Sequence, residues 1–353
     1  MSIDTVVIKI QGNLSDAELT ELLAPAAEII KSGGLVAFPT ETVYGLGADA
    51  TSALAAEKIY AAKGRPSDNP LIIHISSPAE AEKYAYTNGI YYKLAEAFMP
   101  GPLTVILAAK DTVPRATTGG LDTVAVRCPS NRIANRLIAL SGTAIAAPSA
   151  NLSGSPSPTA AKHVIDDMTG RVDAVIDGGD CDFGLESTIV RADADGGVTL
   201  LRPGKITVED IESLGIEVRI ASAVSKELAK GERALSPGMK YKHYAPRARL
   251  VLLDGEVNAF GAYLSANKSE KTGVIAYTED IATLKEFAPK AKYFDFGSRT
   301  DTEAQAHRLF AILRSTDEDS LDVIYAPLPC TDGVGLALYN RMIRAAAHKI
   351  IKL

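Results

Sequence analysis

The sequence predicts a two-domain α/β protein, in which a large, mixed, twisted sheet flanked by helices precedes a smaller, doubly wound parallel sheet of the Rossmann-like type. The chain has 353 residues, 46% of them hydrophobic, which is enough for two cores. Short β-rich runs alternate with helical patterns along the chain, and a basic, aromatic, proline-bounded segment at 236–247 separates two such series. We therefore expect domains at 1–220 and 249–353, joined by a linker at 221–248.

The first domain is expected to open with a helix. Ser15 and Glu18 form a capping-box pattern ahead of apolar residues at helical spacing, and Gly33-Gly34 ends that run. A buried strand follows at 35–38 and stops at Pro39. Further strands are predicted at 71–75, 103–108, 123–127, 143–147, 172–176, 187–190 and 198–201, and helices at 52–63, 90–98, 131–140, 158–168 and 207–214.

The second domain alternates strands and helices at regular spacing. Strands are predicted at 249–253, 274–277, 293–296 and 323–326, and helices at 257–266, 280–288, 302–314 and 334–350. This alternation predicts a parallel sheet with helices on both faces. The linker before it carries proline and tyrosine and shows no Gly/Ser enrichment, so we expect it to be ordered.

Composition narrows the function classes. The net charge of −6 gives no global sign of a nucleic-acid coat or a membrane surface. The first residues lack a signal-peptide pattern, and no apolar run is long enough to cross a bilayer. Cys128, Cys181 and Cys330 are scattered, which fits neither a zinc cluster nor a disulfide framework. We expect a cytoplasmic protein without a membrane partner.

Two cations mark the end of the helical run at 52–63. Lys63 and Arg65 flank Gly64, and Pro66 prevents the helix from continuing. Cations one residue apart in an irregular loop can converge on one anion. A solvated surface pair is the usual alternative, and the return into a buried strand at 71–75 favours the anion site.

A second loop has the side chains of a phosphate site. Ser149 and Asn151 follow a buried strand of small residues, which allow a ligand to approach the backbone closely. Both side chains can donate to phosphate oxygens, although a plain Ser/Asn/Gly turn is an equal alternative. No Walker A sequence, Gly-x-Gly-x-x-Gly before a helix or Gly-x-Ser-x-Gly is present.

Polar residues also stand at strand ends. Arg127 and Arg202 each end a predicted strand, where a guanidinium suits bidentate binding of a carboxylate, and a surface salt bridge is the alternative. Ser187 begins a strand and can face a cleft. His74 lies inside an apolar strand, as core histidines often do.

Taken together, these motifs resemble the YrdC-like family of L-threonylcarbamoyl-AMP synthases over roughly residues 20–205. The resemblance rests on the order and spacing of Phe38–Gly47, Lys63–Arg65, Asn69–Leu71, Pro100–Thr104, Arg127–Pro129, Pro148–Asn151 and Glu186–Thr188. The segment 236–246 is similar to the linker of the longer, two-domain members. The first domain is therefore expected to be a YrdC-like catalytic domain.

The resemblance implies a nucleotidyltransferase. Its reaction joins L-threonine, bicarbonate (or carbon dioxide) and ATP to L-threonylcarbamoyl-AMP and releases pyrophosphate. Mg²⁺ is expected to arrive with ATP, held through the phosphates and by no protein side chain. The product supplies the tRNA threonylcarbamoyl-transferase machinery that modifies the adenosine next to the anticodon.

The resemblance also implies roles for single residues. Lys63, Arg65, Ser149 and Asn151 are expected to be catalytic. They would bind ATP together with Ser67, Thr123, Ser157, Arg202, Tyr241 and His243. L-Threonine would be bound by Thr40, Tyr44, His74, Arg127, Ala147 and Ser187. Tyr241 and His243, on the linker, would fold over the cleft as a lid.

Three alternatives remain at this point. A non-catalytic module could bind double-stranded RNA or tRNA, with Lys63 and Arg65 as backbone-phosphate contacts. A carbamoyltransferase of the hydrogenase-maturation type has a similar domain but also Cys-rich zinc segments, which three scattered cysteines do not match. The second domain could be purely structural.

Overall fold

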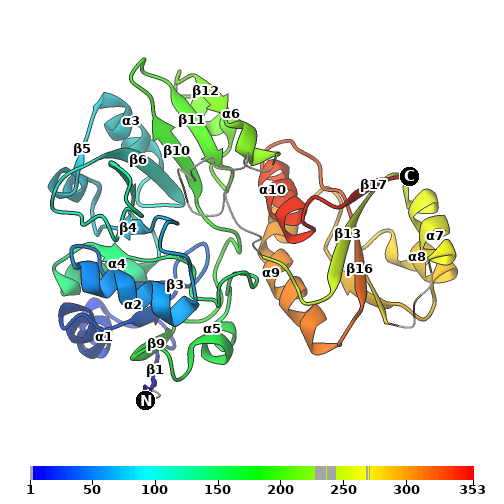
Figure 1. The fold of residues 1–353 in the computed structure, drawn as a ribbon, viewed down its shortest axis with the longest axis horizontal. Coiled ribbons are helices and arrows are strands. Elements are labelled where there is room, and N and C mark those ends of the chain that lie inside the picture. The colour runs from blue at the N-terminus through cyan, green and yellow to red at the C-terminus, as the bar shows by residue number, and fades with distance from the viewer. Residues whose placement is uncertain (1–2, 227–235, 237–243, 268, 270) are drawn as a thin grey trace. The chain divides into compact units, whose positions relative to one another are not determined.

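A computed structural model of the protein describes residues 3–226, 236, 244–267, 269 and 271–353. The chain forms two compact units (Figure 1). The first comprises residues 1–153 and 157–240, and the second comprises 154–156 and 241–353. Most of the predicted linker, 221–248, lies outside the described residues.

A large mixed sheet organises the first unit, as predicted. Its strand order is β1-β9-β2-β3-β8-β4-β7-β6-β10-β11-β12, and β5 pairs with β6. The strands are β1 (Val6–Lys9), β2 (Val36–Phe38), β3 (Gly45–Asp49), β4 (Ile72–His74), β5 (Ala85–Tyr86), β6 (Leu103–Ala109), β7 (Thr123–Arg127), β8 (Ile145–Ala146), β9 (Ala174–Asp177), β10 (Thr188–Ala192), β11 (Val198–Arg202) and β12 (Val218–Ile220). The sheet contains parallel pairs, such as β2–β9 and β4–β7, and antiparallel pairs, such as β6–β7. Some neighbouring strands, such as β2 and β9, are distant in sequence.

Helices cover this sheet and build its core. The predicted capping box starts α1 (Asp16–Lys31): the Ser15 side chain accepts from the Glu18 amide, and Glu18 accepts from the Ser15 amide. Apolar residues of α1 and α4 (Arg132–Ser141) pack on Val36, Phe38 and Ile145 of the sheet. The other helical segments are α2 (Ala53–Lys63), η1 (Pro78–Lys83), α3 (Gly89–Phe98), α5 (Ala161–Met168), α6 (Val208–Glu212) and η2 (Ser222–Val224).

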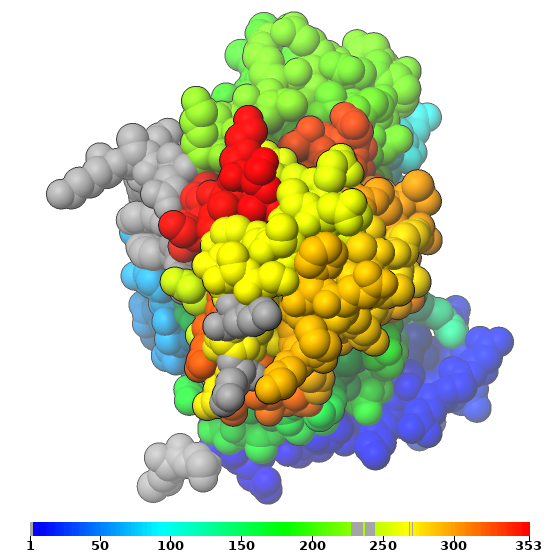
Figure 2. All heavy atoms as spheres, turned by 90° about the vertical axis from the view of Figure 1, so that its right-hand side faces the viewer, coloured from blue at the N-terminus to red at the C-terminus, as the bar shows by residue number. Residues whose placement is uncertain are grey.

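The second unit is the predicted parallel, doubly wound sheet. Its strands β13 (Arg249–Asp254), β14 (Thr272–Ala276), β15 (Lys292–Asp295), β16 (Val323–Pro327) and β17 (Ile350–Lys352) are ordered β15-β14-β16-β13-β17. Its helices α7 (Val257–Ala266) and α8 (Ile281–Phe287) lie on one face, and α9 (Thr302–Glu318) and α10 (Gly335–Ala345) lie on the other (Figure 1). Figure 2 shows the face formed by α7 and α8, in yellow and orange.

The structure corrects the predicted end of the last helix. A continuous helix was expected over 334–350, but α10 ends at Ala345. Ala347 and His348 then adopt positive φ values of 47° and 56°, which a right-handed helix does not allow. The chain turns there, and β17 pairs in parallel with β13 as an additional strand.

A glycine-rich strand was also missed. Gly45–Asp49 forms β3, between β2 and β8. A Cβ at Gly47 would lie 2.6 Å from the Phe38 ring and 2.7 Å from the Ile145 side chain, so only glycine fits this close approach. Across the part of the chain that the structure describes, no helix has the length and apolar character needed to cross a membrane.

Candidate active site

Two motifs that are distant in sequence, the segments 38–47 and 148–151, lie against each other in the first unit. Beside β3, the Leu46 amide donates to the Pro148 carbonyl (2.8 Å), and the Ala150 amide donates to the Tyr44 carbonyl (2.8 Å). The loop after β8, which contains 148–151, is thereby held along the segment 38–47. The amide of Ala147, whose backbone was predicted to bind L-threonine, donates to the Ile72 carbonyl of β4 (2.9 Å).

Lys63 holds the Ser149–Asn151 loop. It ends α2 with only 2% of its surface exposed, and its Nζ donates to the backbone carbonyls of Ser149 and Asn151. The Ser153 amide returns a hydrogen bond to the Lys63 carbonyl (2.9 Å), and the Ser149 hydroxyl donates to Asn151 Oδ1 (2.5 Å). The two predicted phosphate motifs therefore form one cluster, and Lys63 is not a solvated surface cation.

Arg65 closes the next loop. Gly64 ends α2 in the left-handed conformation and turns the chain. The Arg65 guanidinium then donates to the carbonyls of Asn69 (3.3 and 3.4 Å) and Pro70 (3.2 Å). Ser67, another predicted ATP residue, is exposed on the same loop.

Asn69 is a site candidate that the sequence prediction did not include. Its side chain is buried, and neither its amide nitrogen nor its oxygen has a hydrogen-bond partner among the described residues. A buried amide without partners is costly in a folded protein, so this position calls for a polar ligand. The available signal was the motif Asn69-Pro70-Leu71 itself.

Arg127 stands at the centre of a second cluster. It is the register partner of His74 across β4 and β7 and of Thr104 across β6 and β7. Its Nη2 lies 2.8 Å from Oε1 of Glu41, in an ion pair whose members are 5% and 9% exposed. The two atoms touch but are not aligned as a hydrogen bond. The alternative of a surface salt bridge is thereby excluded for Arg127.

His74 lies beside this pair. Burial and the nearby Arg127 charge lower the pKa of His74 to about 3, so the ring is neutral near pH 7. The ring packs edge-on against Phe38, and its Nδ1 has no partner within the described residues. A neutral imidazole can exchange hydrogen bonds with a ligand without repelling Arg127.

Ser187 links two predicted subsites. Its hydroxyl is fully buried, shares a hydrogen bond with Thr104 Oγ1 (2.7 Å) and accepts from Arg202 Nη2 (3.1 Å). Arg202 Nε also donates to the Ser187 carbonyl (3.0 Å). Next to them, Ser157 donates to Glu186 Oε1 (2.6 Å), so Glu186 is a further buried carboxylate that sequence reasoning did not single out.

The remaining predicted residues are less closely gathered. Thr40 is buried and bonds within its own loop, donating to the Val43 carbonyl (2.6 Å). The Tyr44 hydroxyl donates to the Gly179 carbonyl (2.6 Å), and burial raises the pKa of Tyr44. Thr123 begins β7, whose other end is Arg127, about 13 Å along an extended strand. Tyr241 and His243 lie outside the described residues.

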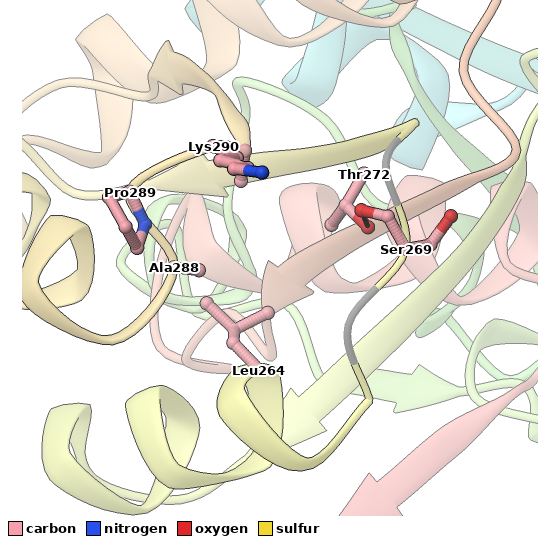
Figure 3. A pocket seen from close by; sticks show the side chains of 7 residues that line it. Leu264, Ser269, Thr272, Ala288, Pro289 and Lys290 are labelled. Atoms are coloured by element: carbon pink, nitrogen blue, oxygen red, sulfur yellow. Dashed lines mark hydrogen bonds between the residues drawn. The ribbon is translucent and has the colours of Figure 1, made fainter.

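The second unit has a pocket of its own, with a volume of about 350 Å³. Leu264, Ala288 and Pro289 lie on one side of it, and the hydroxyls of Ser269 and Thr272 lie on the other (Figure 3). None of its lining residues belongs to the predicted site. Among the described residues of both units, no three His, Cys, Asp or Glu side chains are grouped as a metal site would require.

This fold and these clusters define an α/β protein in which a lysine-held Ser/Asn loop neighbours a buried arginine–carboxylate pair. Comparison with known proteins extends that description. Residues 28–204 match the Sua5/YciO/YrdC family model, described as "Telomere recombination". Residues 206–347 match the model described as "Threonylcarbamoyl-AMP synthase, C-terminal domain".

The similarity to relatives extends over nearly the whole chain. The threonylcarbamoyl-AMP synthase of Pyrococcus abyssi is 41% identical over 99% of this chain and 100% of its own length. That of Bacillus subtilis is 42% identical over 94% of each chain. The crystal structure of P. abyssi Sua5 complexed with L-threonine superposes with a TM-score of 0.88 at 42% identity, covering 99% of this chain and 100% of the other.

The chain belongs to the threonylcarbamoyl-AMP synthase family, in its two-domain form. The predicted enzyme class, a nucleotidyltransferase, is confirmed by this membership.

Proposed function

We propose that this protein is an L-threonylcarbamoyladenylate synthase, which condenses L-threonine, bicarbonate or carbon dioxide, and ATP and releases pyrophosphate. The observation that carries the proposal is the adjacency of two clusters. The loop that Lys63 holds begins next to Ala147, whose amide is bonded to β4, and β4 ends at His74 beside Arg127. A nucleotide and an amino acid bound to these clusters would be neighbours. Relatives named for this product, one of them solved with L-threonine, support the same conclusion.

The chemical step would proceed by displacement at the α-phosphorus. The threonine amine first becomes a carbamate. A carbamate oxygen then forms a bond to the α-phosphorus of ATP, the bond to the pyrophosphate oxygen breaks, and the electron pair leaves with pyrophosphate. The transition state carries its charge on the phosphoryl oxygens, so positioning and positive charge supply most of the catalysis. Lys63 and Arg65 supply that charge on rigid backbone anchors.

The nucleotide would be held by hydroxyl and amide groups of the same region. Ser149 and Asn151 would fix the phosphates, Ser67, Thr123, Ser157 and Arg202 would help hold ATP, and Asn69 would add its buried amide. Mg²⁺ fits as an ion that ATP brings, because it takes oxygen ligands and commonly keeps water and phosphate in its shell. When bound, it neutralises part of the phosphate charge.

L-Threonine would occupy the Arg127 cluster. The guanidinium would bind the α-carboxylate, with the Ser187 hydroxyl beside it. Thr40, Tyr44, the Ala147 backbone and the neutral His74 would complete the pocket. The carbamoyl-adenylate is a mixed anhydride, so the site would have to protect it from water. In the cytoplasm, the product would pass to the tRNA threonylcarbamoyl-transferase machinery.

The experiment that tests this function is pyrophosphate release from ATP by the purified protein, with L-threonine and bicarbonate each added or omitted. Release that requires both substrates and is lost in Lys63→Ala supports the proposal. Release indifferent to threonine, or no release, contradicts it. For the RNA-binding alternative, which needs cations that an extended RNA backbone can reach at the surface, the buried Lys63 is unsuited, and only the half-buried Arg65 of that pair would serve.

A further inference from the structure

Glu41 is a buried carboxylate in the proposed amino-acid pocket that the mechanism above does not use. Its side chain lies against Arg127, with 2.8 Å between Oε1 and Nη2. Neither of its carboxylate oxygens accepts a hydrogen bond from any residue that the structure describes. Its backbone is fixed, because Phe183 donates to its carbonyl (2.9 Å) and Thr40 Oγ1 bonds the neighbouring Thr42 amide (3.1 Å).

A buried pair of this kind restricts which ligands can enter. If a ligand carboxylate takes over Arg127, the Glu41 carboxylate loses its counter-charge inside the protein, which is strongly unfavourable. A ligand that carries an ammonium group next to its carboxylate replaces the single ion pair with two. A simple carboxylate would leave Glu41 unpaired, and a simple amine would leave Arg127 unpaired.

We propose that Glu41 binds the α-ammonium group of the amino-acid substrate and accepts the proton that this group loses when the carbamate forms. The inference rests on the proposed function and deepens it. Arg127 and Glu41 then act as the two halves of one site for a zwitterionic α-amino acid, with the α-carboxylate on Arg127.

The proton balance requires such an acceptor. When the ammonium group reacts with bicarbonate, the N–C bond forms and the C–OH bond breaks. One ammonium proton leaves with that hydroxide as water, one stays on the carbamate nitrogen, and the third must go to a base. Glu41 receives it and becomes a neutral carboxylic acid, while Arg127 remains paired with the substrate carboxylate.

The other titratable groups around Glu41 do not compete for this proton. Cys128 and Cys181 lie within electrostatic range of Glu41, and burial raises the pKa of both thiols, so they stay neutral. His74 faces Arg127, and burial together with the Arg127 charge lowers the pKa of His74 to about 3, so the ring stays neutral beside the guanidinium. Glu41 is therefore the carboxylate beside Arg127 that can receive the proton.

The test compares two ligands by calorimetry: L-threonine and its 2-hydroxy analogue, 2,3-dihydroxybutanoate, which lacks the ammonium. The wild type should bind L-threonine more tightly, and Glu41→Gln should reduce that preference by about tenfold or more. Asp173→Asn is the matched control, because Asp173 accepts a hydrogen bond from the Leu35 amide (2.7 Å) away from this pocket. It should keep the wild-type preference.

The outcomes separate the two proposals. If the wild type does not bind L-threonine, the proposed function and this inference both fail. If it binds L-threonine and Glu41→Gln keeps the full preference, only the role of Glu41 is overturned.

Kinetics test the proton transfer. The variant used is Glu41→Asp, which keeps the negative charge and serves as the second variant if Glu41→Gln does not fold. With a displaced base, Glu41→Asp should lower kcat for pyrophosphate release by about tenfold or more at pH near 7. That deficit should shrink as the pH rises toward the pKa of the substrate amine, because the deprotonated amine needs no base. A purely structural role for Glu41 predicts a deficit that does not change with pH, and that result would refute the proton transfer.

Discussion

The Nζ of Lys63 donates to the backbone carbonyls of Ser149 and Asn151, so one side chain joins the end of α2 to the loop after β8. The contact satisfies two carbonyl groups of that loop with a single buried ammonium. It also fixes the Ser149 hydroxyl beside the Asn151 amide. Lys63 is therefore both a structural anchor and a positive charge at the proposed phosphate site.

The first prediction concerns the stability that Lys63 provides. Lys63→Met keeps the length of the side chain but leaves two carbonyls without a donor, which should cost about 2–3 kcal/mol of unfolding free energy. Lys58→Met is the matched control, because Lys58 lies on the same helix, is exposed and donates to the Gly33 carbonyl. Urea unfolding followed by circular dichroism measures both, and equal midpoints would contradict the anchor.

The second prediction concerns acid stability and His74. The folded-state pKa of His74, about 3, lies below its unfolded value of 6.5, so the unfolded chain binds a proton here that the folded protein refuses. Above about pH 6.5, His74 therefore does not lower the free energy of unfolding. Between about pH 6.5 and pH 3 it lowers this free energy as the pH falls, by at most ~1.4 kcal/mol per pH unit.

Urea unfolding at pH near 7 and pH near 5 checks this prediction. His74→Gln should lose less stability than the wild type over that interval, because glutamine does not titrate. His307→Gln, at an exposed histidine of the second unit, should behave as the wild type does. A wild-type pH dependence in His74→Gln would show that His74 does not titrate as stated.

Local signals in the sequence were sufficient for most of the architecture. The capping box at Ser15 and Glu18, the glycine at the end of α2 and the strand–helix alternation of the second unit are all encoded over a few residues. Strand β3 was missed because its glycines carry no β-propensity; their reason is the close approach of Phe38 and Ile145. Strand β17 was missed because the alanines before it suggested a longer helix.

The composition of the site was predictable only in part. Residue type and position at loops and strand ends pointed to Lys63, Arg127 and Ser149. Other site residues can be recognised only from their burial and from the hydrogen-bond partners that the structure shows. Glu41 and Asn69 are polar residues that sequence alone would place at a surface, and only the packed structure shows them enclosed with unpaired polar atoms. Tyr44 is the opposite case: the sequence suggested a site residue, but its hydroxyl already donates to the Gly179 carbonyl.

The third prediction tests why β3 contains glycine. Gly47→Ala places a Cβ within 2.7 Å of both Phe38 and Ile145, and the overpacking should cost about 1–3 kcal/mol of unfolding free energy. Gly89→Ala is the matched control, since a Cβ at Gly89 meets nothing within 4 Å and Gly89 begins α3. Thermal unfolding of the two variants distinguishes them. Equal melting temperatures would mean that the sheet relaxes around the new methyl group.

The last prediction concerns the hydroxyl pair of Thr104 and Ser187. The two oxygens lie 2.7 Å apart in a fully buried position, and Arg202 donates to Ser187 from the other side. Thr104→Val keeps the shape of the side chain but removes one partner of Ser187, which leaves that hydroxyl free to rotate away from the proposed threonine pocket. The KM for L-threonine in the pyrophosphate assay should rise by about fivefold to tenfold, while the KM for ATP stays nearly constant.

Thr117→Val provides the control for that effect. Thr117 is also fully buried and donates to a backbone carbonyl, that of Ala50 (2.9 Å), so its replacement removes a comparable hydrogen bond. Both variants should lose about 1–2 kcal/mol of stability, but only Thr104→Val should change the KM for L-threonine. An unchanged KM in Thr104→Val, or an equal rise in Thr117→Val, would show that the Thr104–Ser187 pair stabilises the fold without positioning the substrate.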